Sequence, residues 1–164
     1  MIDQNIFNFT VVVAGKEQRA YVLADEGEDR DFHYRVRFDD GYEDVFHEVQ
    51  GELQGLRGAE SAAYADAIKY DVHHFIGLNT DAFWYVFREQ VGDEVVNVWI
   101  FEEEEEDEEE NLSTSWNVHY KKAYRFHLLK VGNAWMVANR DGKDIPAVDR
   151  ELSKKVEFVL KTIL

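Results

Sequence analysis

The sequence contains no cysteine, and this absence excludes several kinds of chemistry at once. Disulfide bonds, thiolate zinc sites and cysteine nucleophiles all need a thiol, which this chain does not have. The first residues show neither a basic region nor the apolar stretch that follows it in a secretory signal. We therefore expect a cytoplasmic protein.

Long apolar runs and basic patches are missing as well. No stretch approaches 18 consecutive apolar residues, so no membrane contact is expected. Lysine and arginine do not cluster with aromatic residues, which argues against nucleic-acid binding. The histidines lack the H-x-H and H-x-x-x-H spacings that bring two imidazoles to one metal, and no phosphate loop or G-x-S-x-G turn occurs. The sequence thus predicts no metal site, cofactor or catalytic residue.

Negative charge is abundant, and much of it lies in one place. The 164 residues carry a net charge of −16, and Glu102 to Glu110 is an unbroken run of nine carboxylates. Outside the run, the remaining 25 of the 34 acidic residues face 18 basic ones, a balance of −7. That balance is ordinary for a soluble domain, and the length predicts one domain over residues 1–164.

The acidic run is predicted to be a mobile hairpin loop over residues 102–112. Like charges four residues apart repel each other, so nine carboxylates without a basic partner oppose a helix. A solvated loop is the simplest interpretation. Contact with a basic partner and a cation site are the alternatives, although the run lacks the glycine turn and mixed ligands of calcium loops.

Four two-residue turns predict antiparallel hairpins. The turns are Gly15-Lys16, Asp40-Gly41, Gly92-Asp93 and Gly132-Asn133. The registers that they impose place Phe9 opposite Val22, Val36 opposite Val45, Arg37 opposite Asp44, His33 opposite Glu48, Phe87 opposite Val98, Tyr85 opposite Ile100, Leu128 opposite Val137 and Lys130 opposite Trp135. Each register puts like side chains on one face, which favours these pairings.

Residues 113–130 alternate between apolar and polar side chains without a break. A two-residue turn at Lys121-Lys122 would reverse this alternation, so the pattern predicts one long, bent strand. His119 and His127 share its polar face. They would lie about 26 Å apart on an extended strand, which is too far for a shared site.

Apolar residues recur at helical spacing over residues 60–78 and 147–163, and both segments are predicted to be amphipathic helices. The expected fold is therefore α+β: a curved antiparallel sheet of about eight strands, built from four hairpins, with two helices packed on one face. The order hairpin, hairpin, helix occurs twice. It suggests two similar ββββα halves.

Two helices cover one face of such a sheet, and the strands over 83–91 and 94–101 are apolar on both faces. An uncovered apolar face of this kind marks an interface. The candidate interface residues are Trp84, Val86, Trp99 and Phe101. The leading functional hypothesis is a non-enzymatic protein-interaction domain that forms a homodimer, or binds another protein, through this aromatic face.

The alternative is a small-molecule-binding protein or enzyme with a pocket between the curved sheet and helix 60–78. Its candidate wall residues combine apolar surface with hydroxyl groups: Tyr64, Trp116, Tyr120 and Tyr124. A third possibility is an anion site at His33, Arg35 and Arg37. Alternating charges on an exposed sheet face give the same pattern without any ligand.

Overall fold

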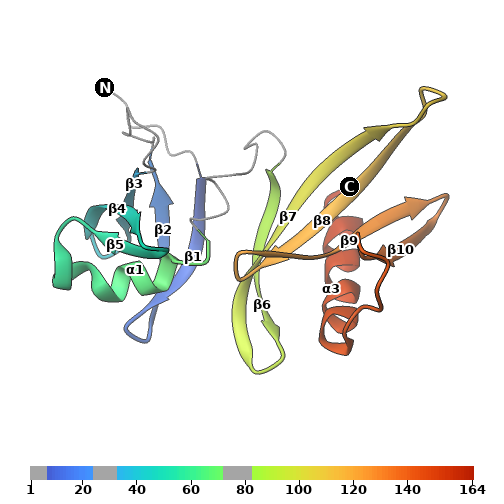
Figure 1. Cartoon of the computed structure of the whole chain (residues 1–164). Coiled ribbons are helices and arrows are strands. Elements are labelled where there is room, and N and C mark those ends of the chain that lie inside the picture. Colours follow the sequence, from blue (N-terminus) through green and yellow to red (C-terminus); the bar gives the residue numbers. More distant parts are fainter. Residues whose placement is uncertain (1–6, 24–32, 72–82) are drawn as a thin grey trace. The chain divides into compact units, whose positions relative to one another are not determined.

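In the computed structural model the chain divides into two compact units, residues 1–78 and 79–164. The structure describes residues 7–23, 33–71 and 83–164. In each unit a five-stranded antiparallel sheet, with its strands in sequence order, is followed by a helix (Figure 1). The two similar halves that the sequence suggests are therefore present as βββββα. The units are described separately below, and their union in one domain stays a prediction.

The first unit is a curled sheet closed by a short helix. Its strands are β1 (Phe7–Val13), β2 (Lys16–Val22), β3 (His33–Phe38), β4 (Glu43–Val49) and β5 (Glu52–Gly55), followed by η1 (Gly58–Ser61) and α1 (Ala62–Ile68). Helix α1 contacts both edge strands, β1 and β5. Its Ile68 is fully buried, as are Val36 and Phe46 of the sheet, so the core lies between the curled sheet and α1.

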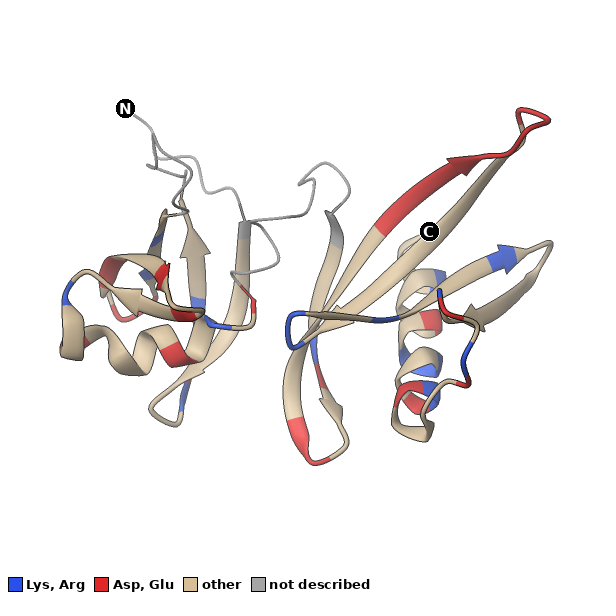
Figure 2. Ribbon diagram, viewed as in Figure 1, with Lys and Arg blue, Asp and Glu red and all other residues tan. Residues whose placement is uncertain are grey.

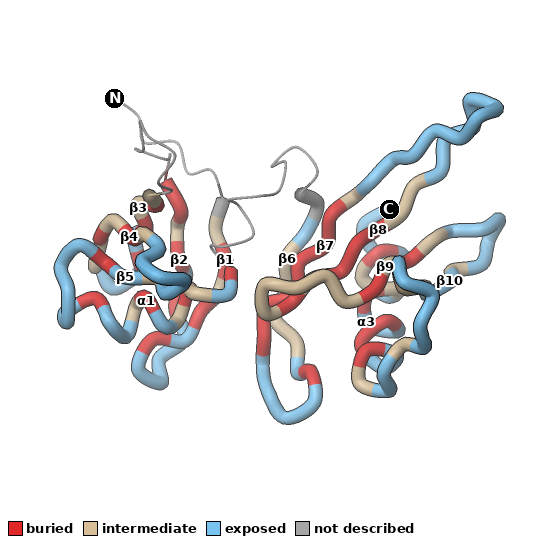
Figure 3. Tube along the Cα trace, viewed as in Figure 1, coloured by how far each residue is buried: buried red, intermediate tan, exposed pale blue. Residues whose placement is uncertain are grey.

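The second unit repeats this plan with longer strands. They are β6 (Phe83–Val91), β7 (Glu94–Glu106), β8 (Leu112–Tyr120), β9 (Ala123–Val131) and β10 (Ala134–Ala138), and the helix is α3 (Ala147–Ile163). Leu152, Val156 and Leu160 of α3 pack against the even-numbered side chains of β7 and β8. Figure 3 shows this buried inner part of the sheet and the exposed outer end of β7.

The structure corrects the predicted fold in its details. There are ten described strands in two sheets, where the sequence predicted about eight in one sheet, and each helix packs on its own sheet. Strand β5 has only four residues, Glu52 to Gly55, of which Leu53 alone has a large apolar side chain, so no alternation predicts it. Gln50 and Gly51 in fact form a two-residue turn, with φ of 53° and 81°.

The predicted long strand over 113–130 is wrong for a definite reason. Lys121 and Lys122 adopt left-handed φ angles of 50° and 65° and turn the chain between β8 and β9 without a glycine. The register then shifts between the pairs His119–Tyr124 and Val118–Phe126, which leaves Arg125 as an extra residue in β9. This β-bulge restores the alternation that the turn reverses.

The hairpin registers are partly confirmed. The pairs predicted for β6–β7 and β9–β10 are those observed. In β1–β2 the turn is at residues 14–15, which moves the pairing by two residues, so that Phe9 lies opposite Ala20. In β3–β4 the turn has three residues, 39–41, because the Phe38 N–H donates to the Tyr42 carbonyl. The register therefore moves by one.

This one-residue shift places Asp44, and not Val45, on the core side of β4. The Asp44 side chain is buried opposite Val36. It accepts hydrogen bonds from the Ser61 hydroxyl and from the Arg57 N–H at 3.1 Å. Gly55 is needed beside it, because a Cβ there would collide with both Asp44 and Ser61. Asp44 thus binds both ends of η1 to the sheet.

The two helices differ in how well they were predicted. Helix α3 has the predicted bounds, 147–163, and starts after Pro146, whose carbonyl accepts the N–H groups of Asp149 and Arg150. Helix α1 ends at Ile68, before the end of the helix that the sequence predicts over residues 60–78. Residues 72–78 of that prediction lie outside the described part. Neither of these two described helices is long and apolar enough to cross a membrane.

More than half of the acidic run belongs to a strand. Glu102 to Glu106 are the outer end of β7 and pair with residues 112–116 of β8. Only residues 107–111 form the turn, where the Asp107 carboxylate accepts the N–H groups of Glu109 and Asn111 at 2.9 and 2.8 Å. Figure 2 shows the acidic residues along the end of this hairpin. The predicted loop over 102–112 is therefore about half as long as expected, and its mobility stays a prediction.

Candidate functional site

A polar cleft of about 410 Å³ lies on the face of the second sheet that points away from α3. Strands β7, β8 and β9 and the segment after β10 supply its walls. The lining residues are Glu103, Glu105, Ser113, Thr114, Ser115, Asn117, His127, Leu129, Lys130, Val131 and Arg140. A cleft of this size is within the range of small-molecule sites.

Strand pairing explains why these side chains meet. Side chains directly opposite each other in neighbouring strands lie on the same face. Glu103 pairs with Ser115, which pairs with Leu129 across β8 and β9. In the next row Asn117 pairs with His127. The acidic strand therefore contributes its odd-numbered carboxylates to the cleft, and Glu102 and Glu104 point to the other face.

Glu103 is held at one side of the cleft by two donors. The Asn117 side-chain amide donates to its Oε2 at 2.7 Å, and the Arg140 guanidinium lies 3.4 Å from the same oxygen. Both charged side chains are about half exposed, and an exposed ion pair of this kind contributes little stability. A ligand can therefore displace Arg140 from Glu103 at small cost.

His127 lines the cleft beside Asn117, and Tyr124 supports it from outside the lining. The Tyr124 hydroxyl lies 2.6 Å from His127 Nδ1, and the Arg140 N–H donates to the same hydroxyl at 3.2 Å. The Arg140 guanidinium lies 4.3 Å from the centre of the Tyr124 ring. Since the hydroxyl already accepts from Arg140, we assign it as the donor to His127 Nδ1. The imidazole is then neutral, with its proton on Nε2.

Burial and charge favour this neutral state. Burial lowers the pKa of His127, and the positive charge of Arg140 lowers it further, against the opposite effect of Glu103 and Glu105. Burial also raises the pKa of Tyr124, which keeps its hydroxyl protonated. His119, whose ring centre lies 5.8 Å from that of Tyr124, has its pKa lowered to about 4, first by burial and then by Arg140 and Arg125.

The prediction that His119 and His127 lie too far apart for a shared site is wrong. Both rings contact Tyr124, with centre-to-centre distances of 5.8 and 6.2 Å. The 26 Å estimate assumed one extended strand, whereas the turn at Lys121-Lys122 places the two histidines on neighbouring strands, β8 and β9.

The four predicted pocket residues do not come together in one wall. Trp116 and Tyr120 are buried in the core beneath α3, where the Tyr120 hydroxyl donates to Asp149 at 2.6 Å. Tyr124 lies on the opposite face, because the bulge at Arg125 changes the alternation. Tyr64 belongs to the first unit, stacks on Tyr42 with ring centres 3.9 Å apart, and donates to Asp40 at 2.6 Å. Of the four, only Tyr124 contacts residues that line the cleft, His127 and Arg140, and it does not line the cleft itself.

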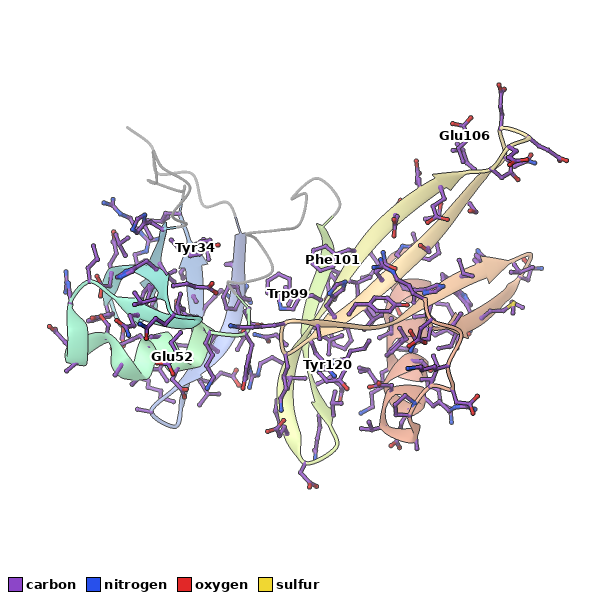
Figure 4. All side chains as sticks on the ribbon, viewed as in Figure 1. Tyr34, Glu52, Trp99, Phe101, Glu106 and Tyr120 are labelled. Carbon is purple, nitrogen blue, oxygen red and sulfur yellow. The ribbon has the colours of Figure 1, made fainter. Side chains whose placement is uncertain are left out.

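The predicted interface residues lie on β6 and β7. Trp99 and Phe101, labelled in Figure 4, lie on β7, where Trp99 is fully buried and Phe101 is 5 % exposed. Val86 is half-buried. Trp84 lies where the register of β6 and β7 shifts, and its side chain is outside the described part. Phe101 packs edge-on against His119, with ring centres 5.1 Å apart.

The three predicted anion-binding residues do share one face of β3. Arg35 lies 3.5 Å from Glu43, and the Arg37 guanidinium lies 5.4 Å from the centre of the Tyr21 ring. His33 lies opposite His47, and not opposite Glu48 as the two-residue turn implied. An anion site here stays a prediction.

The sequence pointed to Tyr124 but missed Glu103, Asn117, His127 and Arg140 as partners in one site. Glu103 was assigned to a loop and His127 to the surface of a single strand. The available signal was the alternation of Thr114, Trp116 and Val118, which permits pairing with the acidic run. Comparison with protein families, curated proteins and solved structures finds no match to this chain.

Proposed function

We propose that this chain is a non-enzymatic binding protein that holds a small zwitterionic ligand in the cleft on β7, β8 and β9. The observation that carries the proposal is the presence of both carboxylates and a guanidinium in one cleft. Carboxylates of Glu103 and Glu105 line it on β7, and Arg140 lines it from the segment after β10.

The remaining lining groups fit such a ligand. Ser113 and Ser115 supply hydroxyl groups that donate and accept, and the neutral His127 offers a donor at Nε2. Leu129 and Val131 add a small apolar surface. A ligand with an amino group toward Glu105 and an acidic group toward Arg140 would match both charges.

Binding is favoured over catalysis because the groups that could move protons are already engaged. The Nδ1 lone pair of His127 accepts the Tyr124 proton, so the imidazole is not available as a general base in this tautomer. Glu103 is bound by Asn117 and Arg140. The arrangement orients donors and acceptors and leaves no prepared base–nucleophile pair among them.

Isothermal titration calorimetry with a panel of small ligands tests the proposal. The panel compares amino acids with the corresponding amines and carboxylic acids, which carry only one of the two charges. Binding of a zwitterion should weaken by roughly tenfold or more in Glu105→Gln, because removing a charged partner from a charge-assisted hydrogen bond costs about 1.5–3 kcal/mol.

Glu104→Gln is the matched control. It removes the same charge from the neighbouring residue of the same strand, but its side chain points to the other face of the sheet. Equal losses in Glu104→Gln and Glu105→Gln would contradict a specific site and indicate only the general attraction of an acidic strand. If no zwitterion in the panel produces a heat of binding, the proposal itself is contradicted.

Self-association is a second candidate, and one observation supports a surface other than the predicted aromatic face. Strand β10 is an edge of its sheet, and none of its five residues, Ala134 to Ala138, is charged. Met136 and Val137 are 52 % and 38 % exposed. Uncharged apolar edges favour pairing with another strand, and proteins usually block such edges with charged side chains.

Sedimentation velocity over a range of concentrations tests this candidate. A dimer that pairs through β10 should dissociate in Met136→Lys, because lysine places a charge on the edge strand. The matched control is Leu112→Lys, which changes another exposed apolar residue at 69 % exposure, far along β8 from that edge. A strictly monomeric chain at all concentrations would exclude self-association through either surface.

A further inference from the structure

Two histidines of the first unit lie directly opposite each other on neighbouring strands. His33 of β3 pairs with His47 of β4, and their ring centres are 5.6 Å apart with the planes inclined at 44°. The three-residue turn at 39–41 creates this pair, because the register from a two-residue turn would have put Glu48 opposite His33. Neither histidine belongs to the cleft in the second unit.

The backbone places this pair at the closest type of cross-strand position. The Phe38 N–H donates to the Tyr42 carbonyl, which makes Phe38–Tyr42 a hydrogen-bonded pair. Hydrogen-bonded and non-hydrogen-bonded pairs alternate along an antiparallel ladder, so His33–His47 is non-hydrogen-bonded. Consistently, the Arg35 and Val45 carbonyls accept from the N–H groups of Leu23 and Leu56, which directly follow β2 and β5. Side chains at non-hydrogen-bonded pairs approach each other most closely.

The separation of the rings suits a single metal ion between them. Zinc binds imidazole nitrogens at about 2.0–2.1 Å in tetrahedral geometry, which puts the centres of two coordinating rings roughly 5 Å apart. The observed 5.6 Å therefore needs only a small rotation of the side chains. Both imidazoles are partly exposed, so an ion can reach them and keep water in its other positions.

His47 also carries an unsatisfied ring nitrogen. Its Nδ1 is buried and has no hydrogen-bond partner, and a buried polar atom left unpaired costs about 1–3 kcal/mol. Gln54 lies opposite His47 on β5 and offers an amide oxygen on the same face. Among the described residues no group of three or more His, Cys, Asp or Glu is arranged around one ion, so the site has two protein imidazoles at its centre.

The geometry points to a two-histidine site for a divalent transition metal at His33 and His47, with Zn²⁺ as the best-fitting ion. Imidazole nitrogens select zinc, copper and nickel over magnesium and calcium, which prefer oxygen. Arg35, one position along the same face, lies near the site, and its ion pair with Glu43 at 3.5 Å reduces its repulsion of a cation. The two imidazoles chelate the ion, and water molecules fill its remaining coordination positions.

Titration of the full chain with Zn²⁺ by isothermal calorimetry tests the site. Replacing either member of a chelate removes the gain from holding both ligands together, so His33→Gln and His47→Gln should each weaken Zn²⁺ binding roughly tenfold or more. Arg35→Gln is the control on the same strand. It removes a nearby positive charge and should leave binding unchanged or tighter.

A second measurement distinguishes this site from the carboxylates of β7. Substoichiometric Cu²⁺, used as a paramagnetic probe, should broaden the imidazole NMR signals of His33 and His47 before those of His119 and His127. The NMR spectra of the variants also show whether they are folded. Zn²⁺ binding that is unchanged in both folded histidine variants, or early broadening at His119 and His127, would overturn the inference.

Discussion

The bulge at Arg125 makes an unusual prediction about deletions in β9. Because Arg125 is the extra residue between the pairs His119–Tyr124 and Val118–Phe126, removing it leaves every other pair in place. The deletion loses the Arg125 Nε hydrogen bond to the Tyr120 carbonyl at 3.2 Å and the guanidinium contact 4.1 Å from the Tyr120 ring. Together these contribute about 1–2 kcal/mol to the free energy of unfolding.

Deletion of His127, two residues further on, has the same length but a different consequence. If the bulge persists, Leu128 turns away from the core. If the chain gives up the bulge instead, Phe126 turns away and Arg125 turns inward. Both Leu128 and Phe126 are fully buried, and losing one such side chain from a core costs about 2–5 kcal/mol. No register avoids the loss, so this deletion should be the more damaging one.

Urea unfolding followed by tryptophan fluorescence measures both free energies on the same scale. We expect the Arg125 deletion to lower the free energy of unfolding by about 1–2 kcal/mol, and the His127 deletion to lower it by about 3 kcal/mol or more. His127→Ala controls for the loss of the imidazole alone. Equal destabilisation by the two deletions would refute the assignment of Arg125 as the inserted residue.

Three further predictions concern single residues of the second unit. Tyr120→Phe leaves the buried Asp149 without the hydroxyl that donates to it at 2.6 Å, and should cost about 1.5–3 kcal/mol in urea unfolding. Lys122→Gly should gain roughly 0.5–1 kcal/mol in the same assay, because glycine adopts the observed φ of 65° without strain. His119 should stay neutral in an NMR titration until the pH falls to about 4. Because the imidazole of His119 binds its proton more weakly in the folded chain, its contribution to the free energy of unfolding is complete above pH 6.5. That contribution is lost as the pH falls from 6.5 toward 4.

The sequence predicts local structure well where turn and alternation agree. Gly92-Asp93 and Gly132-Asn133 are two-residue turns flanked by regular strands, and their registers are confirmed residue by residue. The helix over 147–163 was also found with its bounds, because apolar spacing and Pro146 indicate the same start. The repetition of strands followed by a helix was visible as an order of elements.

The wrong predictions of strands and of the site have one physical origin, which is that turns and bulges interrupt the regular strands at these positions. A left-handed turn made of two lysines and a bulge that cancels its effect leave an uninterrupted alternation, so the pattern cannot distinguish this hairpin from one long strand. The same hidden turn concealed the cleft, because it places His127 on a strand beside β8, opposite Asn117. Glu103 was missed because a run of glutamates has low strand propensity and carries no alternation of its own.

The strand conformation of Glu102 to Glu106 makes the end of the β7–β8 hairpin sensitive to ionic strength. Carboxylates on one face of a strand are about 6.6 Å apart, which is less than the screening distance of about 8 Å at physiological salt and far less than about 30 Å at 0.01 M. The paired residues 112–116 contain no basic side chain to offset the repulsion. Low salt therefore opens the outermost residue pairs between β7 and β8 first, and added counter-ions close them. The length of the ordered hairpin, and with it the edge of the cleft, follows the ion concentration of the surroundings.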